Sequence, residues 1–321
     1  MIRPIAVVGA PSSIGIRPYD NSGIRRLDLA PGALREQRLP ARLAARDCGD
    51  VVPPPYRDIL RPPGRPRNEE GVATYSRALA RHVAAAADGG AFVLVLGGDC
   101  SIVLGCLLGI RRPGRPPAGL VYVDAHSDFA TPEESRTGSA ASMCLALAVG
   151  RGDTPLARLG DDQPLARAAD VVVIGRRDDA EPWYGQDALH ALPILDLPDA
   201  AVRERGPAGA ARAALERVTR PEVGGFWIHV DADVLDPAVL PAVDSPEPGG
   251  LGLDELAELL IPLVRHPGAH GLELTIYDPT LDPDRTSAAR LAALLERVLG
   301  GGSRPAPFAE AFWESLVRSH L

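Results

Sequence analysis

The sequence predicts an α/β fold, a three-layer α/β/α arrangement built on a central and mostly parallel sheet. Short apolar runs alternate with longer stretches of helical periodicity, as expected when helices cover both faces of such a sheet. Three of the apolar runs lead into acidic residues, and α/β sheets bind ligands at the carboxyl ends of their strands. With 321 residues and 45% hydrophobic content, the chain can bury one large core. We therefore expect a single domain over residues 1–321, with residues 306–321 as a C-terminal tail.

Short runs of β-branched and other apolar residues, bounded by glycine, proline or polar residues, predict the strands. The run at residues 51–52 is expected at an edge of the sheet. The proline-rich residues 53–66 that follow it are expected to form a surface loop. In chain order the predicted strands occupy residues 5–9, 51–52, 92–96, 120–123, 171–174, 194–195, 226–230 and 271–276.

Apolar residues that recur at helical spacing predict the helices. Pro31 lies in the first turn of the first one, where its missing N–H costs no hydrogen bond. A last helix or tail at residues 307–319 carries an apolar stripe that would pack either on a neighbouring subunit or on its own domain. The other predicted helices occupy residues 31–45, 69–87, 101–110, 139–149, 208–218, 253–264 and 287–299.

Composition excludes several classes of partner. The net charge is -8 and no block of basic residues stands out, so nucleic acid is not an expected partner. No apolar run reaches the roughly 18 residues that span a bilayer, and the N-terminus lacks a signal-peptide pattern, so we expect a cytoplasmic protein without a membrane segment. The cysteines form no CxxC pair, and reduced thiols are expected at Cys48, Cys100, Cys106 and Cys144.

Potential metal ligands follow three of the predicted strands. After the strand at residues 120–123 they occupy positions i, i+2 and i+4, and an extended backbone directs such side chains the same way. Acidic or thiol side chains also follow the strands at residues 92–96 and 226–230. Together these strand ends, with Asp124, His126 and Asp128 at the central one, predict a carboxylate-rich pocket for divalent metal.

These motifs resemble those of a known family. The segments Gly-Gly-Asp-Cys-Ser (97–101), Val-Asp-Ala-His-Ser-Asp (123–128) and Val-Asp-Ala-Asp-Val-Leu-Asp-Pro (230–237) are similar, in order and spacing, to the three metal motifs of the ureohydrolase (arginase/agmatinase) family. The segment Tyr-Asp-Pro-Thr-Leu-Asp (277–282) resembles the family's exit from its last strand. The resemblance covers residues 5–299 and implies an arginase-like fold.

The resemblance also implies a binuclear manganese site that binds one or two Mn²⁺ ions. A water held between two cations about 3.5–4 Å apart loses a proton near neutral pH and becomes a hydroxide nucleophile. Asp128 would orient that hydroxide and, with His126, would form the catalytic pair. By motif position the first metal takes Cys100, Asp124, Asp128 and Asp231, and the second takes Asp124, His126, Asp231 and Asp233, with Asp124 and Asp231 bridging.

Cys100 departs from the family pattern, which has histidine there. A thiolate is a softer ligand and would shift the first site toward Zn²⁺, Fe²⁺ or Co²⁺. Alternatively, Cys100 is a buried apolar thiol that binds nothing. Cysteine does occur here in branches of the family, including one that resembles the hydroxyarginine amidinohydrolases.

The substrate side of the site departs further. Ala141 stands where the family has a histidine that shuttles protons or binds substrate, and Ser139 in the same segment is predicted to bind substrate. Ile276 stands where a glutamate pairs with the guanidinium, and an alkyl group cannot offset a desolvated cation. Glu273, three residues earlier, is the candidate stand-in for that acid, although in an extended strand it is expected to face the opposite side. Asp178 matches a position that holds the substrate's amino group.

We therefore predict a metal-dependent hydrolase of a linear C–N bond in a small amidine or guanidine, such as a hydroxyarginine-type substrate, rather than ordinary arginine. An amide or formamide hydrolase and a non-catalytic homologue are the alternatives. The resemblance implies a homo-oligomer, a trimer or a hexamer. The remaining histidines, His229 among them, show no partner pattern and are predicted to have surface or structural roles.

Overall fold

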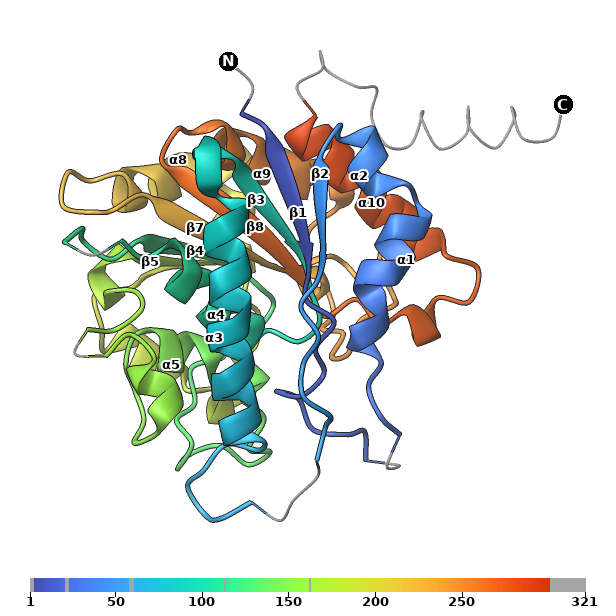
Figure 1. The fold of residues 1–321 in the computed structure, drawn as a ribbon. Coiled ribbons are helices and arrows are strands. Elements are labelled where there is room, and N and C mark those ends of the chain that lie inside the picture. The colour runs from blue at the N-terminus through green and yellow to red at the C-terminus, as the bar shows by residue number, and fades with distance from the viewer. Residues whose placement is uncertain (1–2, 21–22, 58–60, 113, 162, 301–321) are drawn as a thin grey trace, which may run out of the picture.

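An eight-stranded sheet forms the centre of the molecule (Figure 1). The computed structural model describes residues 3–20, 23–57, 61–112, 114–161 and 163–300. Within these residues the strand order is β2-β1-β3-β8-β7-β4-β5-β6, and every pairing between strands is parallel. Helices α3 and α4 pack together on one face of the sheet, while α1, α8, α9 and α10 cover the other. The predicted three-layer α/β/α fold is confirmed.

The strands follow the apolar runs of the sequence, except at one edge. The strand predicted at residues 51–52 was misplaced, because the edge strand β2 lies just before it and is polar and mostly exposed. Arg35 fixes this strand through ion pairs with Asp47 (2.8 Å) and Asp50 (2.6 Å). The strands are β1 (Ile5–Gly9), β2 (Arg46–Asp50), β3 (Phe92–Leu96), β4 (Gly119–Val123), β5 (Val171–Ile174), β6 (Leu195–Leu197), β7 (Phe226–Asp231) and β8 (Ala269–Thr275).

Two predicted helices are interrupted. The helix expected at residues 31–45 is broken at Arg38, whose φ of 58° is left-handed, and a second helix begins at Leu39 with Pro40 in its first turn. The helix expected at residues 139–149 is a 3₁₀ turn at Ala141–Met143 followed by a short α5. The helices are α1 (Ala30–Glu36), α2 (Leu39–Arg42), α3 (Glu69–Ala86), α4 (Ile102–Ile110), α5 (Cys144–Ala148), α6 (Gln186–His190), α7 (Asp199–Arg205), α8 (Pro207–Val218), α9 (Leu253–Arg265) and α10 (Thr286–Leu299).

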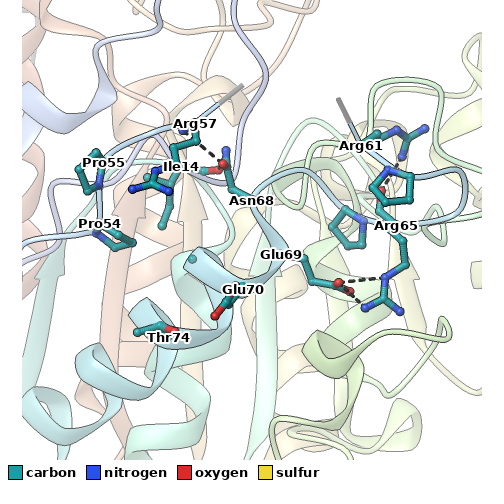
Figure 2. Close-up of a pocket in the computed structure, with 13 residues that line it drawn as sticks. Ile14, Pro54, Pro55, Arg57, Arg61, Arg65, Asn68, Glu69, Glu70 and Thr74 are labelled. Atoms are coloured by element: carbon teal, nitrogen blue, oxygen red, sulfur yellow. Dashed lines mark hydrogen bonds and ion pairs between the residues drawn. The ribbon is translucent and has the colours of Figure 1, made fainter. Parts of the chain in front are cut away.

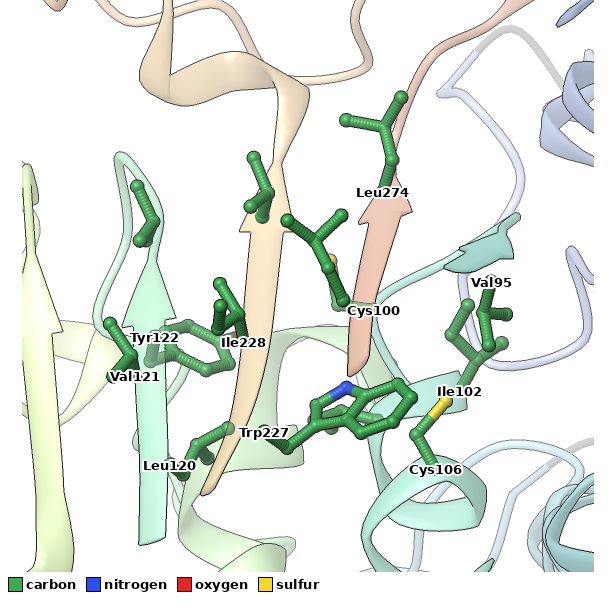
Figure 3. Packing of buried hydrophobic residues seen from close by; sticks show 14 of the residues in the cluster. Val95, Cys100, Ile102, Cys106, Leu120, Val121, Tyr122, Trp227, Ile228 and Leu274 are labelled. Atoms are coloured by element: carbon green, nitrogen blue, oxygen red, sulfur yellow. The ribbon is translucent and has the colours of Figure 1, made fainter. Parts of the chain in front are cut away.

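The core lies between the central strands and the flanking helices. Figure 3 shows Tyr122 on β4 and Trp227 and Ile228 on β7, with Ile102 and Cys106 of α4 nearby. All of these side chains are buried, and the described hydrophobic core forms one connected cluster. Because both faces of β4 and β7 are covered, their carboxyl ends are held rigidly at one edge of the sheet.

Two further expectations concern the surface. In the described part of the loop expected at residues 53–66, Arg61 donates to the Ser135 carbonyl (2.8 Å), and Arg67 just after the loop donates to the Thr137 carbonyl (2.8 Å). The tail at residues 306–321 and its predicted helix lie outside the described residues. In the part of the chain that the structure describes, no helix has both the length and the apolar character needed to cross a membrane.

Candidate metal centre

The carboxyl ends of β3, β4 and β7 bring the predicted ligands together. Val123 and Val230 are paired in register, so the acids that follow them, Asp124 and Asp231, are neighbours at the same edge. Cys100 reaches this edge from the turn after β3, and its thiol donates a hydrogen bond to Oδ2 of Asp231 (2.9 Å). The predicted ligands are all buried there: Cys100, Asp124, His126, Asp128, Asp231 and Asp233.

Among the described residues the candidate ligand atoms fall into three overlapping groups, of which one joins His126 to Glu181 and Glu247 and the other two contain the predicted aspartates. One of these two contains Cys100, Asp124, Asp231 and an unpredicted histidine, His229, with ligand atoms that all lie within 4.8 Å of one another. The other contains Asp124, His126 and Asp233, whose ligand atoms also lie within 4.8 Å of one another. Asp124 belongs to both groups, as expected of a bridging carboxylate.

Backbone amides orient the carboxylates of these groups. The His126 amide donates to Oδ1 of Asp124 (2.7 Å), and the Asp233 amide donates to Oδ1 of Asp231 (2.8 Å). The His126 ring lies close to Asp233, with 3.0 Å between Nδ1 and Oδ2. The second group is therefore held in place by the turns that follow β4 and β7.

Asp128 belongs to neither group but lies next to them. Its φ of 46° turns the chain sharply after the strand exit, and the Tyr122 hydroxyl donates to its Oδ2 (2.7 Å). Asp128 also lines the pocket above the cluster. This position fits a carboxylate that contacts a reacting group.

The electrostatics of the cluster indicate a site for a cation. Burial, followed by repulsion from neighbouring carboxylates, raises the pKa of Asp231 and of Asp128 well above the usual range. Burial also opposes ionisation of Asp124, but the imidazoles of His126 and His229 lower its pKa. Within the cluster, three buried atoms have no hydrogen-bond partner among the described residues, namely Asp124 Oδ2, His126 Nε2 and His229 Nε2. Such atoms are costly unless a cation satisfies them, so this donor set fits a divalent metal.

The pocket above the cluster is small, about 100 Å³. Ser139 lines it and accepts a hydrogen bond from the Arg17 amide on its Oγ (3.0 Å). Ala141 and Ile276 line it as well, and Ile276 is 4% exposed with a φ of 68°. The lining of the pocket is thus partly aliphatic.

Comparison with known proteins identifies this arrangement. The model of the arginase family matches residues 3–300. The chain belongs to the arginase family. Arginase from Bacillus caldovelox is 29% identical over 310 residues, which span 93% of this chain and 99% of that protein. The native structure of the same arginase is 28% identical, with a TM-score of 0.82, and the match covers 94% of this chain and all of that one. The structure of arginase from Bacillus cereus is 27% identical, with a TM-score of 0.80, and that match also covers 94% of this chain and all of that one.

Members of the arginase family are hydrolases that act on C–N bonds, and their binuclear metal site usually holds manganese. The buried cluster of cysteine, aspartate and histidine in this chain is a candidate for such a site. The predicted family and fold are therefore confirmed, and membership of this family supports the predicted class of reaction.

Two predicted substrate-binding residues do not line the pocket. Asp178 is buried and accepts hydrogen bonds from the backbone and hydroxyl of Ser127, both at 2.7 Å. Glu273 is fully buried, and its Oε1 lies 2.8 Å from Nδ1 of His229. These contacts support the turn after β4 and the ring of His229.

Sequence reasoning missed His229 and the ion pair between Arg25 and Asp244. His229 precedes Asp231 by two residues in a strand, and this spacing alone was a signal that the two side chains share a face. Arg25 and Asp244 both line the pocket and pair there, although they lie 219 residues apart in sequence. No local pattern marks that pair.

A larger hollow of about 590 Å³ lies at the N-terminal end of α3 (Figure 2). Prolines and arginines line it, and the Arg65 guanidinium donates to Glu69 (2.9 Å). None of the clustered ligands reaches this hollow. Five of the predicted ligands line the smaller pocket instead, namely Cys100, His126, Asp128, Asp231 and Asp233.

Proposed function

We propose that the protein is a metal-dependent hydrolase of a linear C–N bond in a small amidine- or guanidine-type substrate whose head group is less basic than that of arginine. The observation that carries this proposal is the buried cluster of carboxylates and imidazoles with unpartnered atoms, in a pocket partly walled by Ile276 and Ala141. A protein without chemistry would gain nothing from so costly a burial of like charges.

The clustered residues would hold the metal. Mn²⁺ is the expected ion, and the Cys100 thiol favours Zn²⁺, Fe²⁺ or Co²⁺ at the first position. Bound divalent ions supply Lewis acidity and make water a nucleophile near neutral pH. By family position the first ion would take Cys100, Asp124, Asp128 and Asp231, and the second would take Asp124, His126, Asp231 and Asp233.

The remaining steps are assigned to side chains that face the pocket. Asp128 would orient the attacking water and accept its proton, because it lines the pocket and the Tyr122 hydroxyl fixes one of its oxygens. Ser139 would contact the substrate from the opposite segment. Ala141 has no titratable group, so protonation of the leaving nitrogen has to come from Asp128 or from solvent.

The preference for a weakly basic head group rests on the pocket wall. Of the carboxylates that line the pocket, Asp128, Asp231 and Asp233 belong to the cluster, and Asp244 is paired with Arg25. Ile276 adds only alkyl surface. None of these carboxylates is free to pair with a buried guanidinium, and an unpaired buried cation is strongly disfavoured.

Amide or formamide hydrolysis is the second candidate, because an uncharged carbonyl substrate would also tolerate Ile276. The test is a panel of arginine, agmatine, guanidinobutyrate, hydroxyarginine, simple amides and formamides, each with Mn²⁺, Zn²⁺, Co²⁺ or Fe²⁺. We expect hydroxyarginine or another weakly basic amidine to give the highest kcat/KM. Rapid arginine hydrolysis would contradict the proposed preference, and inactivity with every combination would favour a non-catalytic homologue.

A further inference from the structure

We infer that His229 is a ligand of the first metal position, oriented by Glu273, and supplies the imidazole that is missing where Cys100 stands. This inference rests on the proposed function, because it assumes that the cluster binds metal. It assigns a role to two buried residues that the proposed reaction does not otherwise use.

The sheet register places His229 two residues before Asp231, on the same face of the sheet as the acidic ligands. Tyr122 pairs with His229, and His229 pairs with Glu273, so these three side chains form one row across β4, β7 and β8. Asp124 and Asp231 lie two residues beyond Tyr122 and His229, and side chains two apart in a strand share a face. The imidazole thus lies on the face of the sheet that carries the two carboxylates proposed to bridge the metals.

The ring of His229 is held in one orientation. Its Nδ1 lies 2.8 Å from Oε1 of Glu273, and its plane stacks on Tyr122 with 4.1 Å between ring centroids and 12° between planes. A histidine that donates from Nδ1 to a carboxylate leaves Nε2 with a free lone pair, which is the usual arrangement of a metal-binding histidine. Glu273 is fully buried and therefore supports the ring without solvent competition.

The free nitrogen points into the first group of ligands. His229 Nε2 is buried and has no hydrogen-bond partner among the described residues, and the same holds for Asp124 Oδ2, which lies 3.6 Å from it. That distance is too long for a hydrogen bond. It matches the separation of about 3.3–3.8 Å between ligand atoms that lie about 2.0–2.3 Å from a shared tetrahedral ion.

Cys100 and Asp231 complete the set, in which His229 stands in place of Asp128, and Asp128 then acts only on the attacking water. The ligand atoms of Cys100, Asp124, His229 and Asp231 all lie within 4.8 Å of one another. One sulfur, one nitrogen and two carboxylate oxygens suit a borderline ion such as Zn²⁺, Co²⁺ or Fe²⁺ better than Mn²⁺. Binding would replace the thiol proton that now lies between Cys100 and Asp231, and that proton would leave to solvent.

Cobalt titration of the metal-free protein tests this assignment, because a thiolate bound to Co²⁺ gives a charge-transfer band that reports on the first position alone. We expect the unmutated protein to bind about two ions per chain and to show this band. His229→Asn should bind about one ion and lose the band at equimolar cobalt. Glu273→Gln should keep the band but weaken affinity by about 10–100-fold.

His270→Asn is the matched control. His270 lies on the same strand as Glu273, but its ring contacts the Gly224 carbonyl (2.8 Å), so its replacement should leave cobalt binding unchanged. If His229→Asn keeps two ions and an unaltered band, the inference is wrong and the proposed function stands. If Asp231→Ala keeps full metal content, or the unmutated protein binds none, the proposed cluster itself fails.

X-ray absorption covers the case in which His229→Asn does not fold. With two zinc ions per unmutated chain, ligation by His126 and His229 predicts about one imidazole per zinc on average, and ligation by His126 alone predicts about one half. The lower value would overturn the inference.

Discussion

Replacement of Ile276 by glutamate should increase the activity of the protein on arginine. A glutamate there would place a carboxylate in the aliphatic part of the wall, beside the metal cluster. A hydrogen bond to a charged partner contributes about 1.5–3 kcal/mol net. At about 1.4 kcal/mol per factor of ten, kcat/KM for arginine should rise roughly 10- to 150-fold. The gain for a neutral amide should be absent, because it offers no charge to pair.

The same substitution should be tolerated by the fold. Ile276 has a φ of 68°, a conformation that is strained for a β-branched side chain, by about 1–3 kcal/mol, and less so for glutamate. Burying the new carboxylate costs a similar amount, about 1–3 kcal/mol. The two effects oppose each other, so the free energy of unfolding of the metal-loaded protein should change by about 2 kcal/mol or less.

The assay is steady-state urea release with metal content measured on the same samples. Ile276→Gln is the control, because it adds similar volume and polarity without charge and should leave arginine hydrolysis low. If Ile276→Glu binds full metal and still shows no gain with arginine over Ile276→Gln, the argument from the pocket wall is refuted.

Four further predictions concern metal, stability and assembly. Asp231→Ala should abolish metal binding at both positions, whereas Cys100→Ala should affect mainly the first; elemental analysis decides, and full metal in Asp231→Ala would contradict a bridging role. Chelation should lower the Tm of the unmutated protein, since ligand at about 1,000 times its Kd stabilises by about 4 kcal/mol, and should leave the Tm of Asp231→Ala unchanged. Asp99→Ala should lower the free energy of unfolding by about 3 kcal/mol in denaturant titrations, because Ser12 Oγ (2.9 Å) and the Gly15 amide (3.1 Å) lose a buried acceptor; Asp99→Asn should cost less. Sedimentation should show a trimer or hexamer, and a monomer at all concentrations would contradict the expected assembly.

The sequence by itself determined the fold class and most of the proposed metal ligands. Strands β1, β3 and β5 lie where their apolar runs predict, because a buried parallel strand is recognisable from its own residues. The spacing of Asp124, His126 and Asp128 is equally local. The edge strand β2 was misplaced, because an exposed strand needs no apolar run and its position depends on Arg35. The break at Arg38 was missed, because residues on both sides favour helix and only the backbone turn separates them.

Only the tertiary structure decided which distant residues contact one another around the candidate ligands. His229 and Glu273 are 44 residues apart and meet because β7 and β8 pair in parallel register. The resemblance offered Glu273 as a stand-in for the missing acid, although its spacing from Ile276 predicted the opposite face, and only the sheet register shows that it contacts His229. Arg25 and Asp244 likewise meet only through the fold. Local patterns specify which side chains leave a strand end together, but contacts between distant segments depend on strand order and register, which no short stretch of sequence contains.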